Sequence, residues 1–233
     1  MHELTQLARS WGIDLPAQAA SQFDTYCRLL LKWNERVNLT AITQPREVVE
    51  KHFLDSIIPL GLLEIPHGAA IIDVGTGAGF PGVPLKIARP DLRLTLLDSL
   101  GKRVDFLREL SQALGQDNEI IHARAEDAAH HPDLRERFCA ATSRAVAALP
   151  LLCELCLPFV RPGGIFFALK GPEVDAEITE SGNALATLGA GAMRKEGYTL
   201  PSYGGRSICL AEKVSQTPTK YPRKPKQINR API

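Results

Sequence analysis

The sequence predicts an α/β fold in which a mostly parallel sheet follows a helical N-terminal segment. Three observations support this prediction. Helical periodicity governs residues 1–66, and from Ala69 onward short apolar runs alternate with longer amphipathic ones. The alternation repeats at roughly 25 residues, a spacing typical of strand–helix units in a doubly wound sheet. A glycine-rich stretch, IIDVGTGAGFPG, follows the first apolar run, where such sheets bind ligands.

Residues 1–66 form the predicted helical extension. One helical face is formed by Leu4, Leu7, Ala8 and Trp11, and a second by Phe23, Cys27, Leu30, Trp33 and Val37. The stretch HFLDSIIPLGLL is expected to form a short helix that ends near Pro59. Pro66-His67-Gly68 marks the expected boundary to the next domain, which spans residues 67–214.

Five strand candidates follow in the second domain: AAIIDVG, RLTLLDS, EIIHAR, CAATSRA and GIFFALKG. Helices are expected between them over Val83–Arg89, Lys102–Leu114 and Leu149–Val160. Near the end, GYTLPSYGGRSICLAEK predicts two strands joined through Gly204-Gly205. Such a close hairpin makes the last strand antiparallel to its neighbour.

Composition limits the class of protein. The chain has 233 residues, an apolar fraction of 45% and no stretch near the roughly 20 apolar residues of a membrane span. Met1-His2-Glu3 lacks the order of a signal peptide, so we expect a cytoplasmic protein with no membrane partner. The five cysteines include the pair Cys153 and Cys156 inside LLCELCL, which we interpret as buried small side chains and not as a redox or metal pair. We expect no metal site, and without heptads we expect a monomer.

The C-terminal tail, residues 215–233, concentrates positive charge in a chain whose net charge is only +1. Glu212 is the last acidic residue, and the segment after it is rich in lysine, arginine and proline. Such a composition does not fold alone. Two interpretations stay open: a solvated tail that aids solubility, or an arm that binds phosphates.

The glycine-rich loop fits two cofactors. The spacing Gly77-x-Gly79-x-x-Gly82 matches a dinucleotide fingerprint, whereas Gly75-x-Gly77-x-Gly79 matches a loop that cradles S-adenosylmethionine. A dinucleotide needs N–H groups at the start of the next helix, because they bind its pyrophosphate.

Two prolines after Gly79 and an aspartate before Gly75 favour S-adenosylmethionine. Pro81 and Pro84 each remove an N–H donor from the first helical turn. Asp73 is expected to place an anion beside the ligand, which suits an ammonium and a sulfonium better than a pyrophosphate. Asp98, at the end of the second strand, can accept from both ribose hydroxyls of either cofactor.

The ends of the third and fourth strands also carry candidate site residues. Ala125 and Glu126 either lie beside the adenine or form the acidic first turn of a helix. Ser143-Arg144 follows the fourth strand, where an Asn/Asp-Pro-Pro-aromatic motif of amino-group methyltransferases is absent from the sequence. Beside a sulfonium Arg144 needs a partner, either the methionine carboxylate or an RNA phosphate.

Several segments together resemble one family. They are KWNERVNLTAIT, HFLDSI, DVGTGAGFPGVPLKI, LLDSLGKRVDFL, SRA, ALKG and YPRKPKQINRAPI. From about residue 25 to the C-terminus, the chain is similar to the bacterial 16S rRNA guanine-N7 methyltransferase (RsmG, or GidB) family. The resemblance implies a class I, Rossmann-like methyltransferase fold that transfers methyl from S-adenosylmethionine to N7 of one guanine. It implies cofactor contacts at four places. They are the loop, with Gly75, Gly77 and Phe80, and the ends of the second, third and fourth strands, with Asp98, Ser99, Leu100, Ala125, Glu126 and Arg144.

This chemistry needs no proton transfer, since guanine N7 carries a lone pair and no proton. We therefore predict no catalytic general base. We expect the enzyme to speed methyl transfer by holding N7 in line with the sulfonium. Lys170 and Arg144 are predicted to hold the guanine or its phosphate, with a structural role at a strand end as the alternative for Lys170. Arg223 and Lys224 are the predicted RNA contacts in the tail.

Other functions stay in view. A small-molecule methyltransferase would use the same fold, and an NAD(P)-dependent oxidoreductase is disfavoured by the features of the loop. The sequence leaves open whether the partner is free 16S rRNA, an assembly intermediate or the whole small ribosomal subunit.

Overall fold

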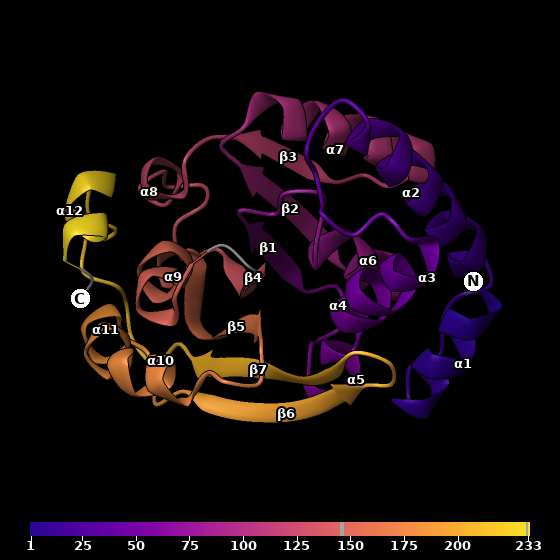
Figure 1. Cartoon of the computed structure of the whole chain (residues 1–233). Helices are drawn as coiled ribbons and strands as arrows, with labels where there is room; N and C mark the ends of the chain where they lie inside the picture. The colour runs from indigo at the N-terminus through magenta and orange to yellow at the C-terminus, as the bar shows by residue number, and fades with distance from the viewer. Residues whose placement is uncertain (145–146, 232) are drawn as a thin grey trace.

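A seven-stranded sheet forms the centre of the computed structural model, which describes residues 1–144, 147–231 and 233 (Figure 1). The strands lie in the order β3-β2-β1-β4-β5-β7-β6. Their bounds are β1 Ala70–Val74, β2 Arg93–Asp98, β3 Glu119–His122, β4 Phe138–Arg144, β5 Val160–Lys170, β6 Arg194–Leu200 and β7 Gly204–Glu212. β7 pairs antiparallel with β5 and β6, and the other pairs are parallel. The predicted mostly parallel sheet with an antiparallel last strand is confirmed.

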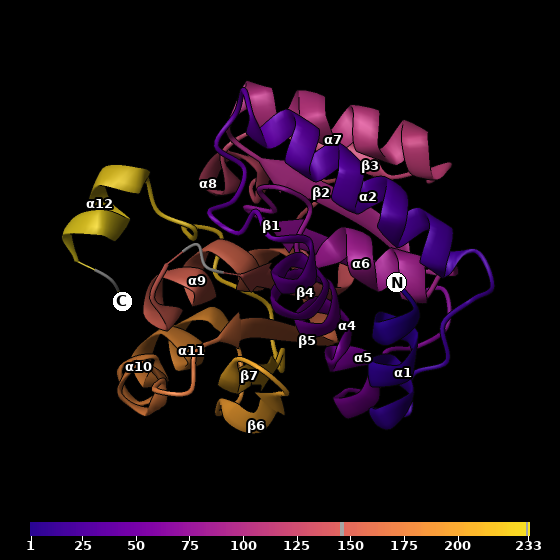
Figure 2. The ribbon, with the colours of Figure 1, turned by 45° about the vertical axis from the view of Figure 1, so that its right-hand side comes forward.

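Helices cover both faces of this sheet (Figures 1 and 2). Their bounds are α1 His2–Ser10, α2 Ala19–Asn34, α3 Pro45–Glu47, α4 Asp55–Ile57, α5 Pro59–Leu62, α6 Gly82–Ala88, α7 Gly101–Leu114, α8 Ala125–Ala128, α9 Leu149–Cys156, α10 Asp175–Glu180, α11 Gly182–Leu188 and α12 Pro225–Arg230. A π-helical segment, η1 (Val48–Leu54), joins α3 to α4, and a 3-10 turn, η2 (Leu157–Phe159), follows α9. The direction of strand order reverses between β1 and β4, where doubly wound folds bind ligands.

The segment around HFLDSIIPLGLL differs from its prediction. A helix was expected to end near Pro59, but helical turns begin at Pro45 and continue through α5. Pro59 is the first residue of α5, a position where the missing N–H would have no helical partner anyway. The π-helical turn was not anticipated; such turns insert an extra residue and are frequent at functional sites.

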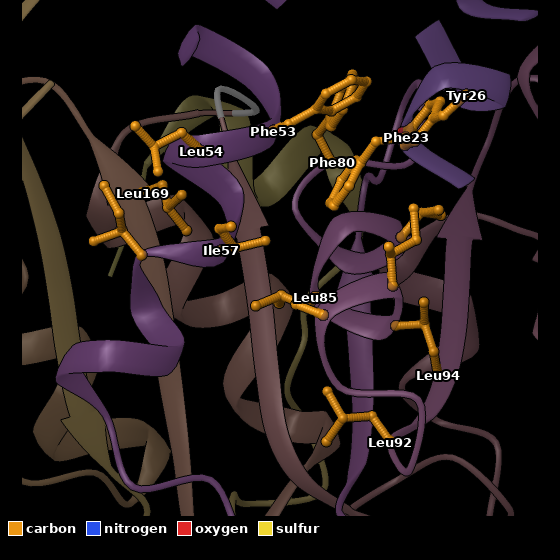
Figure 3. Packing of buried hydrophobic residues seen from close by; sticks show 14 of the residues in the cluster. Phe23, Tyr26, Phe53, Leu54, Ile57, Phe80, Leu85, Leu92, Leu94 and Leu169 are labelled. Atoms are coloured by element: carbon orange, nitrogen blue, oxygen red, sulfur yellow. The ribbon is translucent and has the colours of Figure 1, made fainter. Parts of the chain in front are cut away.

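Aromatic side chains join the N-terminal extension to the glycine loop. Phe23 of α2 packs on Phe53 of η1 with ring centroids 4.8 Å apart. Tyr26, also of α2, stacks on Phe80 of the loop at 5.2 Å and 12° (Figure 3). These residues belong to one buried cluster with Leu85 and other apolar residues of the sheet domain. The extension therefore shares a core with the sheet domain.

The C-terminal tail packs against the other face. Tyr221 and Ile228 are buried in the cluster that also contains Cys153 and Cys156. The interpretation of the tail as wholly solvated is therefore wrong, because its apolar side chains find a core to join. The two ends of the chain lie on opposite sides of the molecule (Figures 1 and 2). The interpretation of Cys153 and Cys156 as buried small side chains is confirmed.

None of the helices in the described part of the chain is long and apolar enough to cross a membrane.

Candidate cofactor and acceptor site

A cavity of about 510 Å³ lies at the carboxyl ends of the central strands. Its lining includes the predicted residues Gly75, Gly77, Phe80, Asp98, Ser99 and Arg144. An adjoining cavity of about 140 Å³ shares Gly75, Asp98 and Ser99 with it and adds Ala125 and Glu126. Leu100, which follows Ser99, is 52% exposed and is not among the residues that line these two cavities. The fold thus gathers residues from four strand ends around these two adjoining cavities.

The glycine loop is held in shape from behind. Gly75, Gly77 and Gly79 have positive φ angles of 68°, 61° and 94°, which favour glycine. Asp73 was expected to face the ligand, and that expectation is wrong: its side chain is fully buried. Its carboxylate accepts from Thr76 Oγ1 at 2.7 Å and from Gly82 N at 2.8 Å. Burial outweighs these hydrogen bonds and raises the pKa of Asp73 to about 6.

The start of α6 has no backbone donors to spare for a phosphate. Gly82 N donates to Asp73, Val83 N donates to the Gly79 carbonyl at 2.8 Å, and Leu85 N donates to the Pro81 carbonyl. Pro84 lacks an N–H. Each position of the first turn is accounted for, so a pyrophosphate would find no backbone partner there.

Asp98 connects the loop to the second strand. Its Oδ2 accepts from Gly77 N and its Oδ1 from Leu100 N, each at 2.9 Å. Arg103 Nη1 lies 3.6 Å from Oδ2. A carboxylate accepts about four hydrogen bonds, so one lone pair on each oxygen remains for a ligand. Asp98 is thus fixed in place and still able to accept from a pair of hydroxyls.

The N-terminal extension supplies one wall of the larger cavity. His52 of η1 stacks on Phe80 with ring centroids 4.4 Å apart, and its Nε2 lies 2.8 Å from Thr40 Oγ1. Its Nδ1 lies 3.2 Å from Arg144 Nη2. A guanidinium only donates, so Nδ1 accepts and Nε2 carries the proton. Burial and the charge of Arg144 lower the pKa of His52 to about 3, which keeps the imidazole neutral at pH 7.

Arg144 is paired with the extension. Its Nη1 lies 3.1 Å from Asp55 Oδ2, and its guanidinium stands over the Phe80 ring at 4.6 Å. Asp55, which is fully buried, also accepts from Arg206 at 3.1 Å and from the Tyr198 hydroxyl at 2.7 Å. Burial raises the pKa of Asp55, but the hydrogen bond from Arg206 and the charge of Arg144 outweigh this and lower it overall.

This buried cluster, Asp55 with Arg144 and Arg206, borders a second cavity of about 270 Å³. His52 and Arg144 line both this cavity and the larger one. Lys51, Tyr203 and Arg206 complete its polar lining. Two guanidinium groups share one carboxylate, so the cluster has a net positive charge beside the cofactor cavity.

The predicted RNA contacts Lys170 and Arg223 are each paired with an acidic side chain. Lys170 Nζ forms an ion pair with Glu177 at 2.8 Å and donates to the Ala147 carbonyl. These contacts fit the alternative prediction, a structural role at a strand end. Arg223 forms an ion pair with Glu154 of α9 at 2.7 Å, and Lys224 beside it is exposed. Within the described residues, none of the three lines the cavities, although Lys170 directly follows Leu169, the strand partner of Arg144.

Sequence reasoning missed His52, Asp55 and Arg206 as site residues. His52 and Asp55 lie in HFLDSI, one of the segments that carry the family resemblance, so a signal was present. Arg206 pairs with a carboxylate 151 residues away, and periodicity does not reveal such a contact.

Comparison with known proteins identifies the relatives. The family model described as rRNA small subunit methyltransferase G matches residues 19–198. A protein of that name from Alkaliphilus metalliredigens is 48% identical over 224 residues, which span 95% of this chain and 94% of the relative. One from Clostridium beijerinckii is 44% identical over 232 residues, which span 99% of this chain and 97% of the relative.

Solved structures support the fold. An O-methyltransferase from Bacillus cereus, in complex with S-adenosylhomocysteine, has a TM-score of 0.59 at 17% identity and covers 82% of this chain and 91% of its own. A predicted O-methyltransferase from Agrobacterium tumefaciens has a TM-score of 0.54, covering 71% of this chain and 81% of its own. These two likenesses show the fold alone, whereas the family model and the relatives at 44–48% identity show that the chain belongs to the rRNA small subunit methyltransferase G (GidB) family.

Proposed function

We propose that this protein transfers a methyl group from S-adenosylmethionine to N7 of a specific guanine in 16S rRNA. Family membership supports the reaction class and the RNA. One observation carries the proposal: the helix start after the glycine loop has no N–H group for a phosphate, and Asp98 beside the loop can accept from the ribose of the cofactor. Every backbone N–H in the first turn of α6 is used or missing, while Asp98 keeps free lone pairs.

The donor set fits S-adenosylmethionine. Asp98 would accept from the ribose hydroxyls, and Ala125 and Glu126 would lie beside the adenine. Gly75, Gly77 and Phe80 would bound the methionine portion, and the combined space falls within the usual size of ligand cavities, about 300–1,000 Å³. When bound, the cofactor supplies an electrophilic methyl group on a sulfonium.

The neutral His52 and the pairing of Arg144 suit that cofactor. A sulfonium is repelled by a nearby cation, but Arg144 is partly neutralised by Asp55 at 3.1 Å. His52 adds no charge, because its pKa is lowered to about 3. Guanine N7 releases no proton on methylation, so these residues orient the base and transfer no proton.

The second cavity supports an RNA acceptor over a small neutral one. Three of its side chains, Lys51, Arg144 and Arg206, are cationic, and cations bind the phosphates that flank a nucleotide. Lys51 is paired with Glu47 at 2.7 Å, and the two arginines share Asp55, so the arginine pair keeps the excess positive charge. An extruded guanine entering between this cavity and the larger one would pass His52 and Arg144, which border both. We propose that the protein acts as a monomer.

Two experiments test the cofactor and the acceptor. Calorimetry with S-adenosylhomocysteine and NAD should give one-to-one binding of the first and no heat from the second; binding of NAD alone would contradict the proposal. Methyl transfer in vitro to free 16S rRNA, to an assembly intermediate and to the whole small subunit should identify the acceptor. Transfer to none of them, with transfer to a small molecule, would favour the alternative of a small-molecule methyltransferase.

A further inference from the structure

We propose that the C-terminal strap, residues 213–231, positions the adenine side of the cofactor cavity, with Arg223 as its positioning residue. The proposal rests on the proposed function, because it takes Ala125 and Glu126 to lie beside the adenine. It assigns the strap a role behind the cofactor site, separate from any contact with RNA.

The first link joins the strap to α9. Glu154 is fully buried, and its carboxylate accepts three hydrogen bonds from Arg223: from N at 2.8 Å, Nε at 2.9 Å and Nη2 at 2.7 Å. A buried carboxylate is tolerated only when it is paired. The next residue, Leu155, lines the smaller cavity. The position of this wall therefore depends on a partner from the strap.

The second link joins the strap to the end of α8. Arg135 Nη1 donates to the carbonyl of Ala129 at 3.1 Å and to that of Tyr221 at 2.8 Å. Arg135 Nη2 donates to the Thr217 carbonyl at 2.8 Å. Ala129 directly follows α8, which carries Ala125 and Glu126. One guanidinium thus ties the adenine wall to the backbone of the strap.

Buried groups anchor the strap at both ends. Lys213 is fully buried and donates to the Leu157 carbonyl at 2.8 Å and to Thr217 Oγ1 at 2.6 Å. Tyr221 and Ile228 lie in the apolar cluster that includes Leu155. The strap and the adenine wall therefore share one core.

The pairing of Arg223 also argues against its predicted role as an RNA contact. Its side chain is 25% exposed, and its charge is neutralised by Glu154. Lys224, the next residue, is exposed and available to a phosphate. The two neighbours therefore offer a matched pair of variants in the full-length protein.

The test compares Arg223→Ala with Lys224→Ala by two measurements. Calorimetry measures the affinity for S-adenosylhomocysteine, and hydrogen–deuterium exchange measures local opening at residues 121–130 and 75–82. Arg223→Ala should weaken S-adenosylhomocysteine binding about tenfold and speed exchange at 121–130, while the loop at 75–82 stays protected. Lys224→Ala should leave both measurements unchanged.

A double variant, Glu154→Gln with Arg223→Ala, separates positioning from stability. It removes the buried charge together with its partner, so it should regain thermal stability without regaining cofactor affinity. Recovery of affinity along with stability would overturn the positioning role. So would an Arg223→Ala protein that binds S-adenosylhomocysteine within twofold of wild type and loses affinity for 16S rRNA. If Arg223→Ala fails to fold, the double variant is compared with wild type instead, again by its thermal stability and its affinity for S-adenosylhomocysteine.

Failure of the proposed function would look different. A wild-type chain that binds no S-adenosylhomocysteine would overturn that function, and with it the cofactor role of the strap. Exchange at 121–130 would still show whether Arg223 supports this wall.

Discussion

The N-terminal extension and the C-terminal strap lie at opposite halves of the space that we propose for the cofactor, and they contribute to it in different ways. The extension lines the cavity: His52 and Thr40 face it, and Asp55 holds Arg144. The strap stands behind the other half and acts on it through Arg223 and Glu154. Loss of a lining side chain should change the chemistry of the site directly, whereas loss of a backing contact should loosen a wall whose own residues are intact.

The largest expected effect falls on the extension side, at Asp55. Asp55→Ala leaves Arg144 and Arg206 without their shared carboxylate, and breaking such a buried pair costs about 3–5 kcal/mol. Chemical denaturation should show this loss. Asp55→Asn keeps one of the two acceptor oxygens and should lose less. Arg46→Ala, at an exposed pair in α3, should change stability by no more than about 0.5 kcal/mol. Equal stability of Asp55→Ala and wild type would show that the extension does not depend on this cluster.

Asp73 lies between the two regions, and its raised pKa makes the stability of the fold depend on pH. Its pKa is about 6 when folded and about 3.9 when unfolded, so the folded protein binds the proton more tightly. Stability from this group is therefore present at low pH and is lost as pH rises from about 4 to 6, by up to about 3 kcal/mol. The difference in unfolding free energy between wild type and Asp73→Asn should change across that window. A constant difference from pH 4 to 8 would contradict the raised pKa.

A smaller effect is expected at Tyr26, which braces the loop from the extension. Tyr26→Phe keeps the stack on Phe80 but removes the hydrogen bond to the Ala78 carbonyl, leaving that acceptor unpaired. The cost should be about 1–2 kcal/mol in thermal or chemical unfolding. Exchange should speed at residues 75–82 and stay unchanged at 121–130, the reverse of the result expected for Arg223→Ala. Exchange that speeds equally at both places would remove the distinction between the two halves.

The smallest effect should come from Lys224. Lys224→Ala removes one exposed positive charge from the strap, so it should leave folding and cofactor affinity unchanged. Binding to 16S rRNA should weaken slightly, and the slope of log affinity against log salt should fall by less than about 1. An unchanged salt slope would remove Lys224 from the RNA interface.

Local patterns carried much of the prediction. The alternation of apolar runs and helices located the strands of the sheet, and the glycines with Asp98 pointed to the cavity that we propose for the cofactor. The contacts that the sequence did not reveal are distant in the chain: Arg144 with Asp55 across 89 residues, and Arg223 with Glu154 across 69. A local signal did exist for the second pair, because an acidic residue inside LLCELCL needs a partner once that helix is buried. Which cation would supply it depends on the path of the tail, which local sequence does not determine.

The proposed reaction is tested most directly in a strain that lacks this gene. Its 16S rRNA is digested with nuclease, and the fragments are analysed by mass spectrometry for 7-methylguanosine. We expect one guanine to lose its methyl group and to regain it when the wild-type gene is restored. Unchanged 7-methylguanosine in the deletion strain, or loss of a different modified nucleoside, would contradict the assignment.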